Sequence, residues 1–216
     1  MIIRDAGSRH IAWFDVHVPH ENKLDGPLSF AHQSKVDHFI IGGDFLNLEF
    51  ASHWNDKFFK QIGIIRHKEL LDEEIYAGRN VIKQIRKAIG KKPKIHWILG
   101  NHEAWLFYVC FYHNMYDLGF NSKSFHYKTD LAAMMDKSLA GLFSRLIGAK
   151  ELGVEIYGFN EPLKIGKILY LHGHQFSPTS TPKKYPGSNL VFGHHHIHKV
   201  TPLYNGGDPR SSREHT

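Results

Sequence analysis

Ile98-Leu99-Gly100-Asn101-His102-Glu103 is the stretch that decides the fold: an apolar run stops at a glycine and continues as an amide, an imidazole and a carboxylate. Apolar runs of this kind are typical of strands buried on both faces. Three polar side chains that follow such a strand would lie together at its end. The stretch therefore indicates a functional site at the end of a buried strand.

The same arrangement of apolar run and polar ending occurs at four other places. They are Trp13-Phe14-Asp15-Val16-His17, Phe39-Ile40-Ile41-Gly42-Gly43-Asp44, Leu169-Tyr170-Leu171-His172-Gly173-His174 and Leu190-Val191-Phe192-Gly193-His194-His195-His196. We expect the fold to bring the five endings together. Because side chains alternate along an extended backbone, Asp15 and His17 are expected to project to the same side, just beyond the first strand.

Composition limits the classes of protein to consider. The 216 residues, 42% hydrophobic and 22% charged, predict a single domain over residues 1–216, with its core at about 9–204 and a polar tail at 205–216. No apolar run is long enough to cross a membrane and the start lacks the apolar core of a signal peptide, so we expect a cytoplasmic protein with no membrane partner. The oligomeric state stays open.

Cysteine content and charge restrict the chemistry. The single cysteine, Cys110, excludes an internal disulfide and a cysteine-based zinc site, so any metal must be held by nitrogen and oxygen ligands. The net charge of +6 favours an anionic partner, such as a phosphate ester or a nucleic acid. Eighteen histidines are the one compositional oddity, and many of them are expected to have no functional role.

Hydrophobic periodicity predicts strands that alternate with helices. The predicted strands cover residues 9–16, 36–42, 93–99, 154–157, 163–171, 189–192 and about 199–203. The predicted helices cover residues 28–35, 66–89 and two or three segments within 104–150. We assign residues 154–157 and 163–171 to a second sheet, residues 1–8 to a loose lead-in and residues 177–188 to a loop.

A basic stretch runs from Arg79 to Lys94 without any acidic residue. The favoured interpretation is a solvated helix face whose last turn is stabilised by the helix dipole. A stripe that binds nucleic acid is the alternative.

Aspartate, asparagine and histidine at the strand endings offer oxygen and imidazole nitrogen, a ligand set suited to Mn, Fe, Zn or Ni. Asp44 is the residue best placed to bridge two cations with its two carboxylate oxygens. Paired divalent ions are an established device for displacement at phosphorus. Two such ions against two carboxylates would leave the site cationic, which suits an anionic ester.

The ordered series Asp-x-His, Gly-Asp, Gly-Asn-His-Glu, His-Gly-His and Gly-His-x-His over residues 15–196 resembles the calcineurin-like metallophosphoesterase superfamily, in particular its compact bacterial and phage-encoded members. The resemblance implies an α/β fold, a four-layer α/β/β/α sandwich with two mixed sheets and a dinuclear centre at the carboxyl ends of the strands. It implies a metal-dependent phosphoesterase, with phosphodiesters ahead of phosphomonoesters. The ions would be two divalent metals, Mn first and Fe, Zn or Ni as alternatives.

The resemblance also implies a role for each residue of the series. The first ion would be held by Asp15, His17, Asp44 and His196, and the second by Asp44, Asn101, His172 and His194. His102 would donate a hydrogen bond to the phosphate and act as the general acid for the leaving group, while a water held by the two ions would be the nucleophile. Asn101 would also face the substrate, and His174 would lie behind His172 or face the substrate.

The sequence departs from the family pattern at Asn47, where many members have the aspartate that orients the catalytic histidine. His102 is therefore expected to be less basic, or to pair with Glu103 instead. Two other functions stay open. A nuclease is favoured by the basic stretch and by Lys183 and Lys184, and would show steep salt dependence. A binding scaffold that has lost its chemistry is disfavoured, because every ligand position is filled.

Overall fold

In a computed structural model of the whole chain, the residues described are 2–5, 7–21, 23–52, 64–112, 128–174, 177 and 180–195. The strands are β1 (Ile2–Asp5), β2 (Ser8–Trp13), β3 (His38–Ile41), β4 (Lys94–Ile98), β5 (Val154–Tyr157), β6 (Leu163–Ile165), β7 (Ile168–Leu171) and β8 (Asn189–Phe192). The helices are α1 (Asp25–Ser34), the 3-10 helix η1 (Glu49–Ala51), α3 (Ile64–Ile89), α4 (Asn101–Tyr112), α5 (Lys128–Ile147), α6 (Ala149–Leu152) and α7 (Thr181–Lys184).

Two mixed sheets form the framework. The larger has the strand order β1-β2-β3-β4-β5, in which β1 is antiparallel to β2 and all the other pairs are parallel. The smaller has the order β6-β7-β8, with one antiparallel and one parallel pair. The prediction of an α/β fold with two mixed sheets is confirmed. Because β2, β3 and β4 are parallel, their carboxyl ends lie at one edge of the larger sheet.

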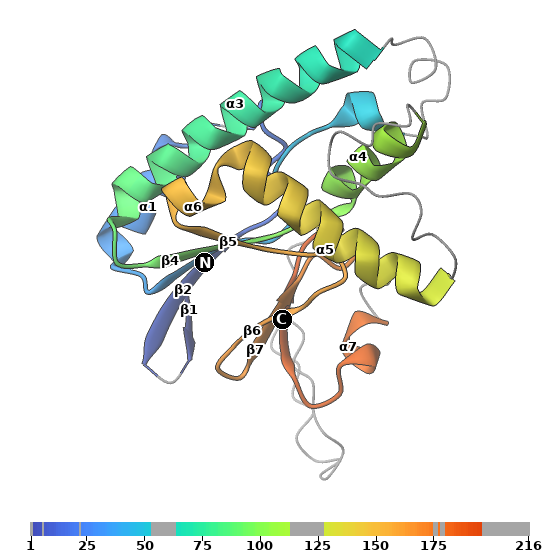
Figure 1. Cartoon of the computed structure of the whole chain (residues 1–216). Coiled ribbons are helices and arrows are strands. Elements are labelled where there is room, and N and C mark those ends of the chain that lie inside the picture. Colours follow the sequence, from blue (N-terminus) through green and yellow to red (C-terminus); the bar gives the residue numbers. More distant parts are fainter. Residues whose placement is uncertain are drawn as a thin grey trace.

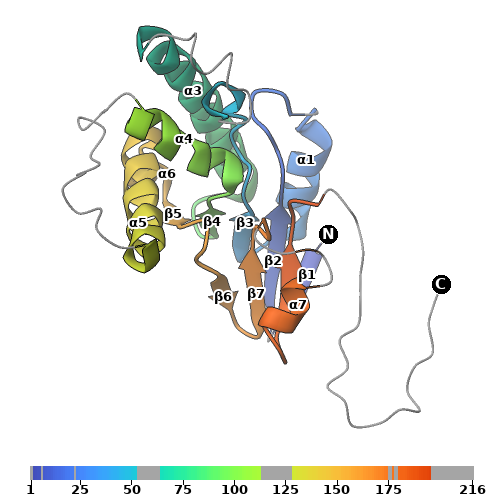
Figure 2. The same cartoon turned by 90° about the vertical axis from the view of Figure 1, so that its right-hand side faces the viewer.

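The larger sheet is covered on both faces. Helices α1, α3, α5 and α6 lie on one side of it and the smaller sheet lies on the other (Figure 1, Figure 2). Phe39 and Trp97 pack in the cluster with the helices, whereas the neighbouring Ile40 and Ile98 pack in the cluster with the smaller sheet. This alternation explains why the central strands are continuous apolar runs. Among the described helices, none is long and apolar enough to cross a membrane.

Three central predictions are confirmed with small changes of boundary. The strands predicted at 36–42 and 93–99 are the shorter β3 and β4, and the helix predicted at 66–89 is α3. In α3, Ile82 and Ile85 are fully buried, as the periodicity requires. The strand predicted at 189–192 is β8.

The ends of the larger sheet differ from the predictions. Residues 1–8 are not a loose lead-in, because Ile2–Asp5 forms β1 and turns back onto β2 through Gly7, which has a positive φ of 86°. Residues 154–157 form β5 beside β4 in the larger sheet, not in the second sheet. The reason is the helical connection through α5 and α6, which returns the chain parallel to β4 in the usual crossover.

Other boundaries also needed correction. The strand predicted at 9–16 ends at Trp13, and the strand predicted at 163–171 is the hairpin β6–β7. The loop predicted at 177–188 contains α7. The strand predicted near 199–203 and the tail at 205–216 lie outside the described residues.

Candidate metal centre

Asp44 is the centre of the site. It follows β3 and is almost fully buried, with 2% of its surface exposed. The donor atoms of His17, Asp44 and His102 all lie within 4.8 Å of one another, and so do those of Asp44, His172 and His194. Each group could hold a metal ion. The two groups share Asp44. The structure therefore brings three other predicted ligands, His17, His172 and His194, close to the carboxylate of Asp44.

The group that contains His172 has the geometry of a ligand set. His172 Nε2 lies 3.1 Å from Asp44 Oδ2 and 2.9 Å from Asn101 Oδ1. The other ring nitrogen, Nδ1, lies 3.1 Å from the carbonyl oxygen of Gly42. A carbonyl can only accept, so Nδ1 carries a proton. Nε2 faces two oxygens and is the nitrogen that a second proton or a cation would bind; burial lowers the pKa of this ring, but the hydrogen bond to Asp44 and its charge raise it overall. Three acceptor atoms that converge in this way, with the far nitrogen held by a carbonyl, fit a bound cation.

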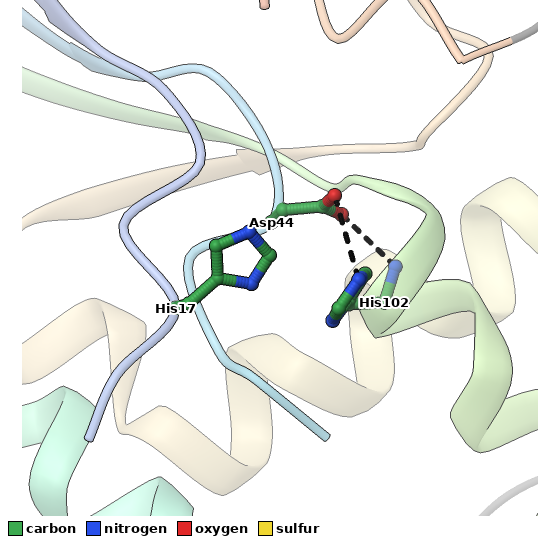
Figure 3. Close-up of side chains that lie close together, drawn as sticks. All are labelled: His17, Asp44 and His102. Atoms are coloured by element: carbon green, nitrogen blue, oxygen red, sulfur yellow. Dashed lines mark hydrogen bonds and ion pairs between the residues drawn. The ribbon is translucent and has the colours of Figure 1, made fainter. Parts of the chain in front are cut away.

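The other group consists of His17, Asp44 and His102 (Figure 3). The backbone N–H of His102 donates to Asp44 Oδ1 at 2.9 Å, and the ring nitrogen Nε2 is 3.9 Å from Asp44 Oδ2. Nδ1 donates to the carbonyl oxygen of Asn47. The ring of His17 meets the His102 ring edge-on, with 4.6 Å between centroids. His102 is therefore fixed in one orientation, with Nε2 towards the carboxylate.

Asp15 connects the first polar ending to the last. Both of its carboxylate oxygens accept from the backbone N–H of His194, at 3.1 and 2.9 Å. The donor atoms that gather with His17 and Asp44 are those of His102 and not those of Asp15. His196, the remaining predicted ligand, lies outside the described residues, as does the neighbouring His198.

His174 lies behind His172, with 5.8 Å between their ring centroids. It also packs against Phe159 at 5.0 Å. Both of its ring nitrogens are buried, and neither has a hydrogen-bond partner in the described part of the chain. His174 is therefore a buried imidazole beside His172, and among the described residues its two ring nitrogens are free to bind a further polar group.

The backbone is strained at the predicted ligands. Six described residues other than glycine have a positive φ, and four of them are Asp15 (53°), His17 (54°), Asp44 (46°) and His194 (70°). Such conformations cost energy and tend to occur at functional sites. They also correct the sequence argument for Asp15 and His17, which lie beyond the end of β2. A left-handed backbone, and not the alternation of an extended strand, places these two side chains.

Glycines allow the loops to approach closely. A Cβ at Gly43, which has a φ of 99°, would collide with the ring of His172. A Cβ at Gly100 would collide with the backbone nitrogen and the carboxylate of Asp44. The close backbone approach expected from the Gly-Asp motif is therefore present.

The pKa shifts of Asp44, His174 and His194 favour the forms that bind metal, whereas Asp44 raises the pKa of His172 against the effect of burial. Burial alone would raise the pKa of Asp44, but the hydrogen bond from His172 and the charges of His172 and His102 hold it at about 2. Burial lowers the pKa of His194, and burial together with the charge of His172 lowers that of His174 to about 4. Around neutral pH the carboxylate is therefore ionised and these two imidazoles are neutral, as metal binding requires.

Glu103 has a role that the sequence analysis missed. Its carboxylate is fully buried and accepts from the backbone N–H groups of Asp44 (3.1 Å), Leu46 (2.8 Å) and Gly100 (2.6 Å). It therefore ties the loop after β3 to the start of α4, instead of pairing with His102. The bond to Gly100 is a capping-box contact, in which a glutamate at the third helical position binds the residue before the helix. That spacing is readable in the sequence.

Trp105 is a second residue that was missed. Its ring stacks on that of His102, with 3.9 Å between centroids and 29° between planes. The two residues are three positions apart on α4, a spacing that places side chains on one helix face. Trp105 therefore restricts the orientation of the His102 ring.

The basic stretch lies away from this centre. Arg79 donates to the carbonyl of Ile147 and pairs with Glu151, and Arg86 donates to four backbone carbonyls. Lysines from this stretch line a cavity of about 680 Å³ at the amino ends of β3 and β4. The candidate metal centre is at the carboxyl ends of the same strands.

Comparison with protein-family models, with curated proteins and with solved structures found no match for this chain. The function must therefore be argued from the chemistry of the site.

Proposed function

We propose that the protein is a metal-dependent phosphoesterase with two divalent ions that share Asp44. The observation that carries this proposal is the pair of donor groups that share one buried carboxylate. The ions would be Mn²⁺ first, with Fe, Zn or Ni as alternatives, since the donors are carboxylate, amide oxygen and imidazole. The ligands would be those that the family resemblance implies, Asp15, His17, Asp44 and His196 for one ion and Asp44, Asn101, His172 and His194 for the other.

Divalent ions at this site would supply Lewis-acid charge for phosphoryl oxygens and would lower the pKa of water. The chain supplies the proton transfer. With Nδ1 of His102 donating to Asn47, Nε2 is the nitrogen that gains and loses a proton. When protonated, Nε2 can donate to the phosphate and then to the leaving oxygen. Trp105 and Asn47 hold the ring in place for that step.

An anionic ester suits the charge of the site. Two divalent ions against Asp15 and Asp44 leave excess positive charge, and the lowered pKa values of His174 and His194 keep those rings from adding more. The family resemblance favours phosphodiesters over phosphomonoesters. It also implies an outer helical layer on the smaller sheet, which would complete a four-layer sandwich.

A nuclease of the same kind is the second candidate. One observation favours it: the positive charge of Lys184 acts on His174, so a cation of α7 is near the site. The basic stretch gives no such support, because its lysines lie at the opposite end of the sheet.

The test uses metal-stripped protein with a chromogenic phosphodiester, a phosphomonoester and DNA, each with and without Mn²⁺. We expect hydrolysis to return with the metal and to be lost in Asp44→Asn. Faster cleavage of DNA, with a steep dependence on salt, would identify the nuclease. Tight metal binding without hydrolysis of any ester would leave the non-catalytic scaffold as the function.

A further inference from the structure

His102 is oriented by a backbone carbonyl where many family members have a carboxylate. Its Nδ1 donates to the oxygen of Asn47, and the Asn47 side chain takes no part in that bond. A loop carbonyl is a less rigid partner than a side chain held on a helix, unless the loop itself is fixed. The orientation of His102 therefore depends on what holds the peptide group that joins Asn47 to Leu48.

The N–H of the same peptide group is bound by an acidic side chain. The N–H of Leu48 donates to Oε2 of Glu74 at 2.7 Å. A trans peptide is planar and its N–H and C=O point in opposite directions. The carboxylate of Glu74 and the imidazole of His102 therefore bind the two ends of one peptide unit, in the order carboxylate, N–H, C=O, ring N–H.

The segment is also in a conformation that needs support. Leu48 is fully buried and has a positive φ of 43°, which is unfavourable for a leucine. The N–H of Asn47 donates to the carbonyl of Val18 at 2.9 Å, which ties the segment to the loop that carries His17. Glu74 supplies the contact from the other side.

Glu74 stands on a rigid element. It is on α3, next to the buried residue Ile75. Burial raises the pKa of its carboxyl to about 7, and the backbone N–H groups of Leu48 and Asn47 oppose that increase. A half-buried carboxylate that is bound by backbone N–H groups polarises the peptide it binds, and hydrogen bonds in a chain strengthen one another.

We propose that Glu74 is a positioning residue for His102, acting through the Asn47–Leu48 peptide group. It keeps the Asn47 carbonyl directed at Nδ1, so that Nε2 faces the site, and thereby replaces the direct histidine–carboxylate pair that Asn47 cannot form. The test has two parts. The activity measurement rests on the proposed phosphoesterase function, whereas the measurement of the His102 ring by NMR is independent of that function.

Two variants separate the effect of the negative charge of Glu74 from the effect of its hydrogen bond to Leu48. Glu74→Gln keeps an oxygen for the Leu48 N–H but removes the negative charge, and Glu74→Ala removes both. Glu73→Gln is the matched control, because Glu73 is the adjacent residue on α3 and its side chain is 65% exposed. Thermal unfolding establishes that each variant is folded. If Glu74→Ala does not fold, Glu74→Gln carries the test.

Activity is compared on two phosphodiesters, one with an alkyl leaving group and one with p-nitrophenolate. Only the alkoxide needs a proton, so for the alkyl ester we expect kcat to fall about 10–100-fold in Glu74→Ala, with KM unchanged. The fall should be smaller for the p-nitrophenyl ester and for Glu74→Gln, and absent in Glu73→Gln. In a His102→Ala background, Glu74→Ala should have no further effect.

The second readout is nitrogen NMR of the histidine rings in metal-free protein, with the His102 signals identified from His102→Ala. We expect the tautomer protonated at Nδ1 in the wild type and a mixture of tautomers in Glu74→Ala. Equal losses on both esters, additivity with His102→Ala, or an unchanged His102 tautomer would overturn the proposal. A wild type that hydrolyses no ester would overturn the proposed function instead, and the NMR result would still decide this inference.

Discussion

Histidines gather at both ends of the same parallel strands, and the two groups differ in what they face. At the carboxyl ends, the rings of His102 and His172 both face the carboxylate of Asp44. Nearer the amino ends, His10, His38 and His96 lie on the adjacent strands β2, β3 and β4, and the ring of His38 packs against the rings of the other two. We call these the carboxyl-end group and the amino-end group.

The amino-end group is held by neutral hydrogen bonds. His38 Nδ1 lies 2.9 Å from His96 Nε2, His10 Nδ1 lies 2.8 Å from the hydroxyl of Tyr170, and His96 Nδ1 lies 3.1 Å from the hydroxyl of Tyr157. Burial lowers the pKa of all three histidines. Their backbones are part of regular strands, without the positive φ values of the carboxyl-end group.

A cluster of histidines alone therefore does not indicate a metal site. A buried carboxylate that serves two donor groups, and a left-handed backbone at the donors, distinguish the carboxyl-end group. In the amino-end group, Glu155 lies 3.3 Å from His96, but its side chain is 57% exposed and three donors do not gather there within the described residues. We therefore expect the amino-end group to serve stability.

The largest expected effect comes from removing the shared charge. Asp44→Asn keeps an oxygen near the His102 N–H but removes the negative charge that both donor groups use. We expect kcat/KM for a chromogenic phosphodiester with Mn²⁺ to fall by about 10³-fold or more. His96→Gln, in the amino-end group, should stay within about twofold of the wild type. Similar losses in the two variants would remove the distinction between the groups.

The next effect sharpens the role of His102, which belongs to a donor group but is proposed as the acid. His102→Ala should lower turnover of an ester with a poor leaving group by about 10²–10⁴-fold. Metal affinity, measured by calorimetry, should change little, in contrast to Asp44→Asn. A strong loss of metal affinity would make His102 a ligand, and unchanged turnover would remove its acid role.

A smaller effect is expected for His96→Leu. The substitution leaves His38 Nδ1 without its partner and removes a contact of the Tyr157 hydroxyl, at a site where His96 is 3% exposed. We expect the free energy of unfolding to fall by about 1–3 kcal/mol, as measured by urea denaturation. Activity per folded molecule and metal affinity should not change. A loss of metal binding would show that the amino-end group is also a metal site.

The smallest expected effect is a difference between the wild type and His96→Gln in how the free energy of unfolding depends on pH. Burial lowers the pKa of His96 to about 4, whereas a histidine in the unfolded chain titrates near its ordinary pKa of 6.5. Between these values the unfolded state binds more protons, so the contribution of His96 to stability is lost as pH falls from 6.5 to 4.

His96→Gln should therefore lose less stability over that interval when both proteins are followed by urea denaturation. Glu74 and Glu103, whose pKa values are raised to about 7, act in the opposite sense but are present in both proteins and cancel in the difference. Parallel stability curves would contradict the burial of a neutral His96.

Much of the framework could be read from the sequence, because long apolar runs and helical periodicity report burial directly. Asp44, Asn101 and His102 were located for that reason, since each follows a buried strand. Strand β1 was missed and β5 was assigned to the wrong sheet, because pairing with a neighbouring strand decides their place and an apolar pattern does not report that pairing.

The apolar pattern identifies candidate site residues but not the geometry of the loops that carry them. The sign of φ at Asp15 and His17 leaves no trace in an apolar pattern, so the sequence argument for where these two side chains point was wrong. Glu103 and Trp105 follow spacing rules within α4 and were available to sequence analysis. The contact between Glu74 and Leu48 joins a helix to a distant loop, and only tertiary packing reveals it.

The left-handed backbone at four predicted ligands affects how substitutions there should be chosen. Alanine at such a position costs about 1 kcal/mol in backbone conformation, whereas asparagine and glycine accept it readily. An alanine scan would therefore confuse the loss of a donor with the distortion of a turn, and a β-branched replacement would do so more strongly. Asparagine at Asp15 and Asp44 would remove the charge, and glycine at His17 and His194 would remove the donor, while the turn is kept in each case.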